Sequence, residues 1–366
     1  MKQMHEKTKI LFVAQNLYVG GVQKAFVNLL YKAEKSGKYD ISVFTFAKGA
    51  LEAEVPHNIP IRVGNKILRL SATPLGSIKA TGNVIDIAIR IFVTVLAKII
   101  GSERFYRLVF RKQAEKYDIA VSYFTDVPIG VFNKGTNLYV SDFANADKKI
   151  AWIHTDPILS GFDKEYCRRI YKPFDKIICV SDAVRQKFNE LLPEYSNKTE
   201  TRHNVFDEEK IKKLAIECEP FKKSRFDIVT VARVDNASKR IDGILNMCRR
   251  LKDNDISDFC WRIIGDGPDL NRNIELANEL GVDDVVIFEG EKLNPYPYIY
   301  KSDLFALYSA YEGFPLVIGE ALILKTPILT TNYAAAREQI LPDGGTIADS
   351  DEIFFEYLTD YIIGNN

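Results

Sequence analysis

The sequence predicts an α/β protein with two domains, each built on a parallel β-sheet. Its 366 residues exceed the roughly 150 residues expected of one domain. Short β-rich runs alternate with helical segments, which is typical of parallel βαβ units, and this alternation starts again after a charged stretch near the middle. Hydrophobic residues make up 46% of the chain and charged residues 27%, which is an ordinary globular composition.

The first half contains the first set of alternating segments. An apolar run at 9–14 predicts the first strand, and the segment 21–34 predicts the helix that follows it. Later segments predict strands at 41–46, 118–124, 150–153 and 174–180, and a helix at 182–192. We assign residues 1–205 to an amino-terminal domain.

The second half repeats this organisation. Apolar runs predict strands at 226–232, 259–264, 285–288, 304–308 and 328–330. Helices are expected near 241–251 and 270–280, and from Pro315 onward, since proline is favoured in a first helical turn. We assign 206–224, which is charged and weakly patterned, to a linker, and 225–366 to a carboxy-terminal domain.

The segment 62–116 carries eleven basic side chains and three acidic ones. Within it, a helix over 84–101 would place Asp86, Arg90 and Lys98 on one narrow face and leave a broad apolar surface. Two interpretations stand side by side: a peripheral contact with an anionic membrane, or a core helix with solvated neighbours.

The remaining composition excludes several classes of function. Lys plus Arg equals Asp plus Glu, 49 each, so no global field attracts nucleic acid, and none is expected as a partner. The five cysteines are odd in number and contain no Cys-x-x-Cys pair, which argues against a disulfide framework and a structural zinc site. We therefore expect a cytoplasmic protein.

The stretch from Ser309 to Glu320 is the most informative. It follows a predicted strand and leads into the helix at Pro315, so its backbone N–H groups and helix dipole suit a phosphate group. Carboxylates accept hydrogen bonds from hydroxyls, so Glu312 and Glu320 could hold a sugar ring and a ribose. The residues of this stretch that we expect to bind a donor of a phosphate-linked sugar are Gly313, Phe314, Pro315, Leu316 and Glu320.

In this stretch Glu-x7-Glu lies within the frame Ser-x-x-Glu-Gly-Phe-Pro, which resembles the signature of glycosyltransferase family 4. Members of that family are retaining enzymes of the GT-B architecture, in which two Rossmann-like domains face a cleft. The resemblance therefore implies that the domain 1–205 binds the acceptor and that the domain 225–366 binds the nucleotide sugar. The resemblance implies a nucleotide diphosphate sugar, UDP- or GDP-linked, as the donor. It implies no cofactor and no metal.

Companion motifs extend the resemblance through the second half. Val231-Ala-Arg233 and Lys239 resemble the family's Gly-Arg…Lys-Gly element, whose two cations grip the donor diphosphate. The turn Gly265, Asp266, Gly267 and Pro268 resembles the family's Gly-Asp-Gly-Pro turn beside the nucleoside. The resemblance thus gives catalytic roles to Glu312, Arg233 and Lys239.

Further motifs lie in the first domain and at its end. Gly20 and Gly21 resemble the family's glycine loop after the first strand, and Asn204 belongs to a segment like its Asn-x-x-Asp junction. The resemblance implies that these three residues bind the donor. His154 resembles the family's cleft histidine, which adds it to the catalytic set, but a lone histidine at a strand end is also compatible with a satisfied core residue.

Some positions depart from the family pattern. Arg240 replaces the glycine after Lys239, and Lys325-Thr326-Pro327 stands where the family usually has Gly-x-Pro. The loop beginning at Asn332 lacks the usual glycine pair, and the chain ends sooner after Ala348 than the family's carboxy-terminal helices do. These departures put the fine geometry of donor binding and domain closure in question.

The resulting hypothesis is a metal-independent hexosyltransferase in capsule, exopolysaccharide or lipopolysaccharide synthesis, acting on a saccharide or lipid-linked acceptor at the inner membrane face. Two alternatives stay open: a nucleotide-sugar epimerase of the same fold, and a catalytically silent partner of an active glycosyltransferase. Asp253-Asn-Asp255 spells the Asp-x-Asp of metal-dependent transferases, but it lies in a polar connection and is interpreted as solvated loop.

Overall fold

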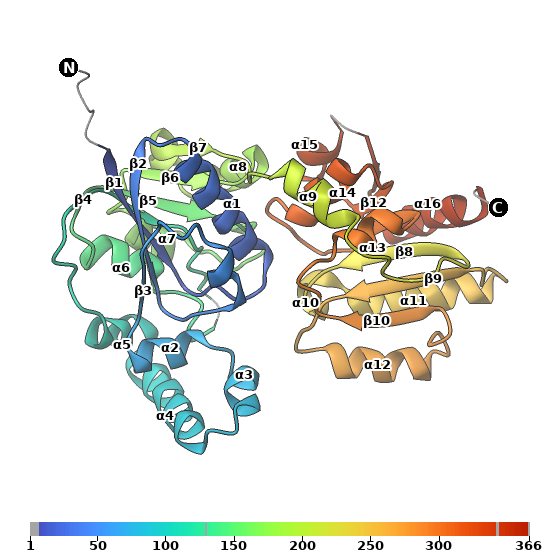
Figure 1. The fold of residues 1–366 in the computed structure, drawn as a ribbon, viewed down its shortest axis with the longest axis horizontal. Helices are drawn as coiled ribbons and strands as arrows, with labels where there is room; N and C mark the ends of the chain where they lie inside the picture. The colour runs from blue at the N-terminus through green and yellow to red at the C-terminus, as the bar shows by residue number, and fades with distance from the viewer. Residues whose placement is uncertain (1–6, 129, 342–343, 365–366) are drawn as a thin grey trace. The chain divides into compact units, whose positions relative to one another are not determined.

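The computed structural model describes residues 7–128, 130–341 and 344–364. The chain divides into two compact units, Met1–Val205 and Phe206–Asn366 (Figure 1). Each unit is built around its own parallel sheet, which confirms the predicted fold class of two parallel-sheet α/β domains.

The first unit contains a seven-stranded sheet in the order β3-β2-β1-β4-β5-β6-β7. Because the order runs outward in both directions from β1 and β4, the topology switches between these two strands. Ligands of open α/β sheets bind beyond the carboxyl ends of the strands at such a point. The strands are β1 (Thr8–Ala14), β2 (Tyr39–Thr45), β3 (Ile61–Val63), β4 (Tyr117–Ser122), β5 (Ala146–Ile153), β6 (Lys176–Cys179) and β7 (Thr199–Thr201).

The crossover helices of this unit begin at residues that satisfy exposed backbone N–H groups. The Asp163 carboxylate accepts from the Tyr166 N–H, and the Ser181 hydroxyl accepts from the Val184 N–H. Helix α1 begins at Gly20 without a side-chain cap, so its first amides remain available. The helices are α1 (Gly21–Lys35), α6 (Thr136–Asp142), α7 (Lys164–Tyr171) and α8 (Asp182–Leu191), with 3₁₀ segments η1 (Ala50–Glu54) and η2 (Pro193–Lys198).

Four further helices are inserted between β3 and β4. They gather at one end of the first unit, beyond the sheet (Figure 1). They are α2 (Lys66–Ala72), α3 (Leu75–Ala80), α4 (Val84–Ile100) and α5 (Ser102–Val109), and α4 contacts the other three. The helix expected over 84–101 is therefore present as α4. Among the residues that the structure describes, no helix has the length and apolar character needed to cross a membrane.

The second unit contains a six-stranded parallel sheet in the order β10-β9-β8-β11-β12-β13. Its topology switches between β8 and β11, which pair in parallel through Ile228 and Val229 of β8 and Leu304 and Phe305 of β11. The strands are β8 (Phe226–Val231), β9 (Phe259–Ile264), β10 (Val286–Gly290), β11 (Leu304–Leu307), β12 (Ile328–Thr331) and β13 (Thr346–Ala348).

Two groups of helices accompany this sheet. Helices α11 (Ile241–Asp253), α12 (Leu270–Glu279) and α16 (Asp351–Gly364) bury apolar side chains in one core with β8 and β9. Helices α9 (Glu208–Ala215), α13 (Tyr296–Lys301) and α14 (Leu316–Leu324) contact one another. Two short helices complete the unit: α10 (Asn236–Lys239) and α15 (Ala336–Ile340).

Helix α9 occupies the segment 206–224 that we expected to be a linker. Asp207 caps it by accepting from the Lys210 N–H, and it buries Ile211 and Ala215. Since α9 contacts α13 and α14, this part of the segment belongs to the second unit and is not a free connection.

Candidate functional site

The two chain segments that leave β8 and β11 lie side by side in the second unit. Adjacent parallel strands end at the same sheet edge, so the segment from Ala232 and the segment from Tyr308 begin next to each other. Two hydrogen bonds fix the second segment: the Ala310 N–H donates to the Ser238 carbonyl at 2.8 Å, and the Thr331 hydroxyl donates to the Ser309 carbonyl at 2.6 Å. The site predicted from these two motifs is therefore brought together.

Lys239 and Glu312 form an ion pair at this edge. The ammonium of Lys239 contacts Oε1 of Glu312, which also accepts from the Ser309 hydroxyl at 2.7 Å. The side chains are 20% and 12% exposed, so water screens the pair only in part. Burial and the Glu312 charge raise the pKa of Tyr333, which lies nearby. A cation and a carboxylate are thus held together where a substrate phosphate and a sugar hydroxyl could each find a partner.

Arg233 is the more accessible of the two predicted cations. Its guanidinium pairs with Asp235, and the Arg233 side chain is 66% exposed. Asp235 also begins α10, because its other oxygen accepts from the Ala237 and Ser238 N–H groups. Burial and the charge of Asp235 raise the pKa of Tyr311. Asp235 was not singled out in the sequence, and its contacts show that it orients Arg233.

The Gly265–Pro268 turn lies against the start of the same segment. The Val234 N–H donates to the Asp266 carbonyl at 3.0 Å, and the Asp269 carboxylate accepts from the Asn236 N–H at 2.8 Å. A side chain at Gly265 would place its Cβ 1.9 Å from the Ala232 carbonyl oxygen, and one at Gly267 would lie 2.2 Å from that of Val234. Both glycines are therefore required by close backbone packing, and Asp266 is exposed beside the predicted cations.

Helix α14 begins directly after this cluster. It starts at Leu316 with Pro315 as its first flanking residue, as predicted, and no side chain caps its first amides. The Gln339 amide donates to the Pro315 carbonyl at 2.9 Å and accepts from the Tyr333 hydroxyl at 2.9 Å. Because α15 fixes the loop in this way, the amino-terminal end of α14 is held in one orientation. Positive backbone dipoles at such an end favour an anion.

Glu320 lies one turn inside α14 and is buried. Its Oε1 accepts from the Tyr296 hydroxyl of α13 at 3.1 Å, so this carboxylate already has a partner in the protein. Its neighbour Gly319 has a packing role, since a Cβ there would lie 2.2 Å from the ring of Phe206. The glycine inside the signature therefore lets the start of the second unit pack on α14.

The first unit presents a different arrangement at the carboxyl edge of its sheet. Gly20 and Gly21 begin α1, as predicted, and the Asn16 side chain accepts from the Gln23 amide at 2.8 Å beside them. Gly20, Gly21 and Asn204 lie in this unit, whereas the other predicted donor contacts lie in the second. The structure groups the site residues within each unit, and the donor-binding role of Gly20, Gly21 and Asn204 stays a prediction.

His154 is held by the backbone of a neighbouring strand end. Its Nε2 lies 2.8 Å from the Tyr123 carbonyl, which accepts only from a protonated nitrogen, and its own N–H donates to the Thr125 hydroxyl at 2.7 Å. Burial of the ring lowers the pKa of His154 to about 3, so the imidazole is neutral. These contacts are those of a satisfied histidine whose Nδ1 remains an acceptor.

Both departures at family glycine positions occur where the backbone is left-handed. Arg240 has φ of 48° between α10 and α11, and Lys325 has φ of 59° after α14. The Arg240 guanidinium makes two hydrogen bonds to Asp351, at 3.0 and 2.8 Å, and lies 4.2 Å from the centroid of the Tyr308 ring. Lys325 is exposed. The chain therefore keeps the backbone shape at both positions without glycine.

The Asp253-Asn-Asp255 motif lies at the carboxyl end of α11, whereas Lys239 lies just before the amino end of that helix. Asp253 is the partner of Arg249 one turn earlier, at 2.6 Å. This contact accounts for Asp253 without a metal ligand role.

Comparison with known families identifies the second unit. Residues 212–360 match the model of the family described as glycosyl transferases group 1. The second unit is a group 1 glycosyltransferase domain. This match covers the Lys239–Glu312 pair, the Gly265–Pro268 turn and α14.

Curated relatives extend the likeness beyond the group 1 domain. An uncharacterized glycosyltransferase of Methanocaldococcus jannaschii is 25% identical over 278 residues, which are 71% of this chain and 66% of the relative. An N-acetylgalactosaminyltransferase of Campylobacter jejuni, whose name specifies a diphospho-undecaprenol acceptor, is 30% identical over 146 residues, 40% of this chain and 38% of the relative. The chain thus aligns with less than two thirds of the length of either relative.

Solved structures show the fold of the whole chain. The Anabaena protein HepE in complex with UDP-glucose has a TM-score of 0.66 and 18% identity, over 98% of this chain and 90% of that one. The lipopolysaccharide outer core galactosyltransferase WaaB has a TM-score of 0.58 and 16% identity, over 98% and 91%. With the group 1 domain as its second unit, the chain has the GT-B fold.

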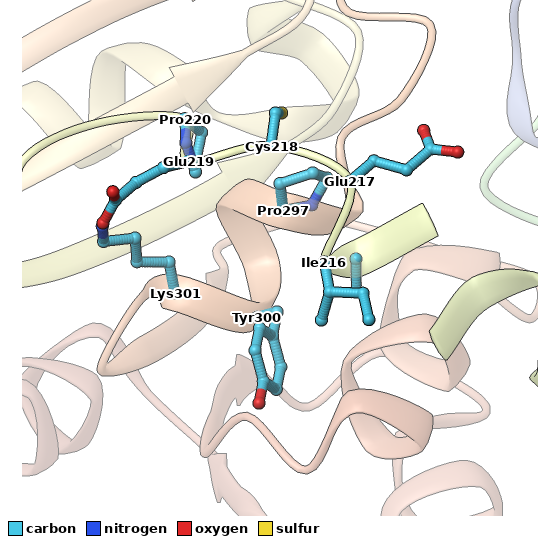
Figure 2. Close-up of a pocket in the computed structure, with 9 residues that line it drawn as sticks. Ile216, Glu217, Cys218, Glu219, Pro220, Pro297, Tyr300 and Lys301 are labelled. Carbon is cyan, nitrogen blue, oxygen red and sulfur yellow. The ribbon is translucent and has the colours of Figure 1, made fainter. Parts of the chain in front are cut away.

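The group 1 domain also contains a pocket of about 450 Å³ between the end of α9 and α13 (Figure 2). Glu219 and Lys301 form an ion pair beside it, and Ile216 and Tyr300 are exposed. None of the predicted site residues lines this pocket. Its lining offers no convergent cations for a diphosphate, so the edge at β8 and β11 is the better candidate site.

Proposed function

We propose that this chain transfers a hexosyl group from a UDP- or GDP-linked sugar to a lipid-linked saccharide acceptor in the synthesis of a bacterial-type surface glycan. The pairing of Lys239 with Glu312 beside α14, at the switch point of the group 1 domain, is the observation that carries this proposal. The names of similar proteins support the acceptor class, because the Campylobacter jejuni enzyme is named for a diphospho-undecaprenol acceptor and WaaB for the lipopolysaccharide outer core.

The chemistry assigned to the site is stabilisation of a departing nucleoside diphosphate. Arg233 offers a planar fork for two phosphate oxygens and Lys239 a compact charge, while the first amides of α14 add a third positive surface. These groups are fixed before the reaction, which is the arrangement that stabilises developing charge most effectively. They supply the charge that the leaving group needs, so the proposal includes no metal.

Bond making and breaking follow from that placement. The acceptor oxygen forms a bond to the anomeric carbon as the bond from that carbon to the diphosphate oxygen breaks. The acceptor proton passes to a leaving phosphate oxygen, and the configuration at the anomeric carbon is retained. Glu312 accepts a hydrogen bond from a donor hydroxyl and holds Lys239 in position.

Matched substitutions test the proposal. We expect Lys239→Ala and Arg233→Ala each to reduce transfer from a radiolabelled nucleotide sugar by about 100-fold or more, the effect of removing one donor to developing charge. Lys252→Ala and Arg249→Ala are the controls, because each removes a cation that is also paired with a carboxylate but lies on α11, away from the switch point. Equal turnover in all four variants would refute the assignment.

Two assays separate the alternatives. A nucleotide-sugar epimerase would convert donor without any acceptor, whereas a transferase releases nucleoside diphosphate when membrane-extracted, undecaprenyl-linked saccharide is added. A silent partner would show no increase in unfolding temperature with UDP, GDP or their sugars, since a ligand stabilises only a protein that binds it. Retained activity in EDTA would support metal independence.

A further inference from the structure

Helix α4 of the first unit exposes an apolar face to solvent. Val84, Phe92 and Ile99 are 76%, 67% and 76% exposed, and they recur at helical spacing along one side. Ala88 is also exposed on this side. We call this surface the outer face of α4; its large apolar side chains are Val84, Ile85, Ile91, Phe92, Val95 and Ile99.

Two charged residues of α4, Asp86 and Arg90, face inward instead. Asp86 forms an ion pair with Lys66 of α2 at 2.7 Å, and the Arg90 guanidinium lies 4.5 Å from the centroid of the Phe132 ring. Val93 and Ala97 are buried on the same side. A helix on the surface of a water-soluble domain normally has the opposite polarity. Asp86 and Arg90 of α4 thus have partners within the unit, Lys98 is exposed, and the apolar groups of the helix are left for another environment.

The surrounding charge indicates what that environment is. In the described part of the segment 62–116, all three acidic side chains have cationic partners: Asp86 with Lys66, Glu103 with Arg107 and Arg169, and Glu115 with Arg62. Seven cations of the described segment take part in none of the ion pairs found there: Arg69, Lys79, Arg90, Lys98, Arg104, Arg111 and Lys112. The net excess of positive charge would repel a second copy of this chain and attract anionic lipid headgroups.

We propose that the outer face of α4 inserts into the interface of an anionic lipid bilayer, with the neighbouring cations on the headgroups. The helix has 17 residues, fewer than the roughly 20 needed to span a bilayer, and it presents one apolar side, so it lies along the surface. This membrane contact is separate from sugar transfer. It rests on the proposed function in one respect, which is that it would bring the enzyme to a lipid-linked acceptor.

Vesicle flotation of the full-length chain tests this surface. On vesicles of phosphatidylcholine with phosphatidylglycerol, Phe92→Glu/Val95→Glu should lower the bound fraction about tenfold or more. The control variant Leu293→Glu/Ile363→Glu changes two exposed apolar residues of the second unit and should bind like the unsubstituted chain. Binding should also weaken on pure phosphatidylcholine and at high salt, because both remove the electrostatic contribution.

The outcomes are separable. Failure of the unsubstituted chain to float, or equal flotation of both double variants, overturns the proposal. So does a dimer that Phe92→Glu/Val95→Glu converts to a monomer, because the occupant is then a second copy. The increase in unfolding temperature with UDP or GDP should be the same in all three proteins; its absence in all of them, with flotation intact, counts against the proposed function alone.

Discussion

The carboxyl edges of the two sheets hold their predicted catalytic side chains in different ways. In the second unit, Lys239 pairs with Glu312 and Arg233 with Asp235, so each charged side chain has a charged side chain as its partner. In the first unit, the ring of His154 is bound by the Tyr123 carbonyl of the backbone, although Asp156 nearby pairs with the Lys187 ammonium as well as with backbone N–H groups.

This difference distinguishes an edge that is able to bind a ligand from an edge that supports the fold. Each side chain of an ion pair can leave its partner and bind a charged group of a ligand instead, because each can rotate about its own bonds. A side chain bound to the backbone of a strand end can change partner only if the chain moves with it. We therefore expect substitutions at the first edge to alter stability and those at the second to alter ligand binding.

The largest effect should come from Gly319→Ala, which affects both properties. The new Cβ would lie 2.2 Å from the Phe206 ring, so α14 or Phe206 must move. We expect a loss of about 1–3 kcal/mol in the free energy of unfolding, as for other overpacked cores, measured by urea denaturation. Because α14 presents its first amides to the donor, the stabilisation by UDP or GDP should fall as well.

A second substitution controls for this effect. Phe206→Leu removes part of the ring that the new methyl group contacts, so the double variant should regain stability relative to Gly319→Ala. Additive losses in the double variant would contradict the proposed contact between Gly319 and Phe206.

His154→Gln should change stability with pH and leave nucleotide binding intact. Burial lowers the pKa of His154 from 6.5 to about 3, so as the pH falls the unfolded chain takes up a proton that the folded chain does not. The stability from this group is present above pH 6.5 and is lost as the pH falls toward 3. Between pH 7.5 and 5.5 the free energy of unfolding should fall by about 1 kcal/mol more in the unsubstituted protein than in His154→Gln. The glutamine keeps an amide donor for the Tyr123 carbonyl but does not titrate.

Urea denaturation at the two pH values measures this difference. Parallel pH dependence in the two proteins would show that His154 is accessible to protons. A loss of UDP or GDP stabilisation in His154→Gln would remove the distinction between the two edges.

Much of this arrangement could be predicted from the sequence because it follows from strand ends. The apolar runs of β8 and β9 have clear limits, and the segments after neighbouring parallel strands must meet, so Lys239 and Glu312 could be expected together. Helix α9 was missed because charged residues dominate its composition. Its signal was local: Asp207 is a typical cap, followed by acidic residues in the first turn and Lys212 and Lys213 in the last.

Contacts between distant residues could not be predicted in this way. No periodic pattern links Phe206 to Gly319 or Tyr296 to Glu320, because both contacts depend on how separate helices pack. The sequence predicted the apolar surface of α4 and the shared side of Asp86 and Arg90, but Lys98, which it placed with them, is exposed. The direction of each side depends on Lys66 and Phe132, which contact Asp86 and Arg90 from other elements.

The smallest effects should come from the two left-handed residues at the margin of the second edge. Glycine at either position removes about 1–2 kcal/mol of backbone strain from the folded state. It also makes the unfolded chain more flexible, which lowers the free energy of unfolding by about 0.4–1 kcal/mol. For exposed Lys325, we expect Lys325→Gly to raise the free energy of unfolding by about 0.5–1 kcal/mol on these terms. Arg240→Gly gains the same relief but loses the contacts to Asp351 and Tyr308, so its net change should lie about 1 kcal/mol below that of Lys325→Gly. Urea denaturation of both variants measures this difference in the free energy of unfolding. Equal stabilisation by the two substitutions would show that the contacts of Arg240 with Asp351 and Tyr308 contribute nothing to stability. Nothing in the fold would then compensate for the departure from glycine at that position.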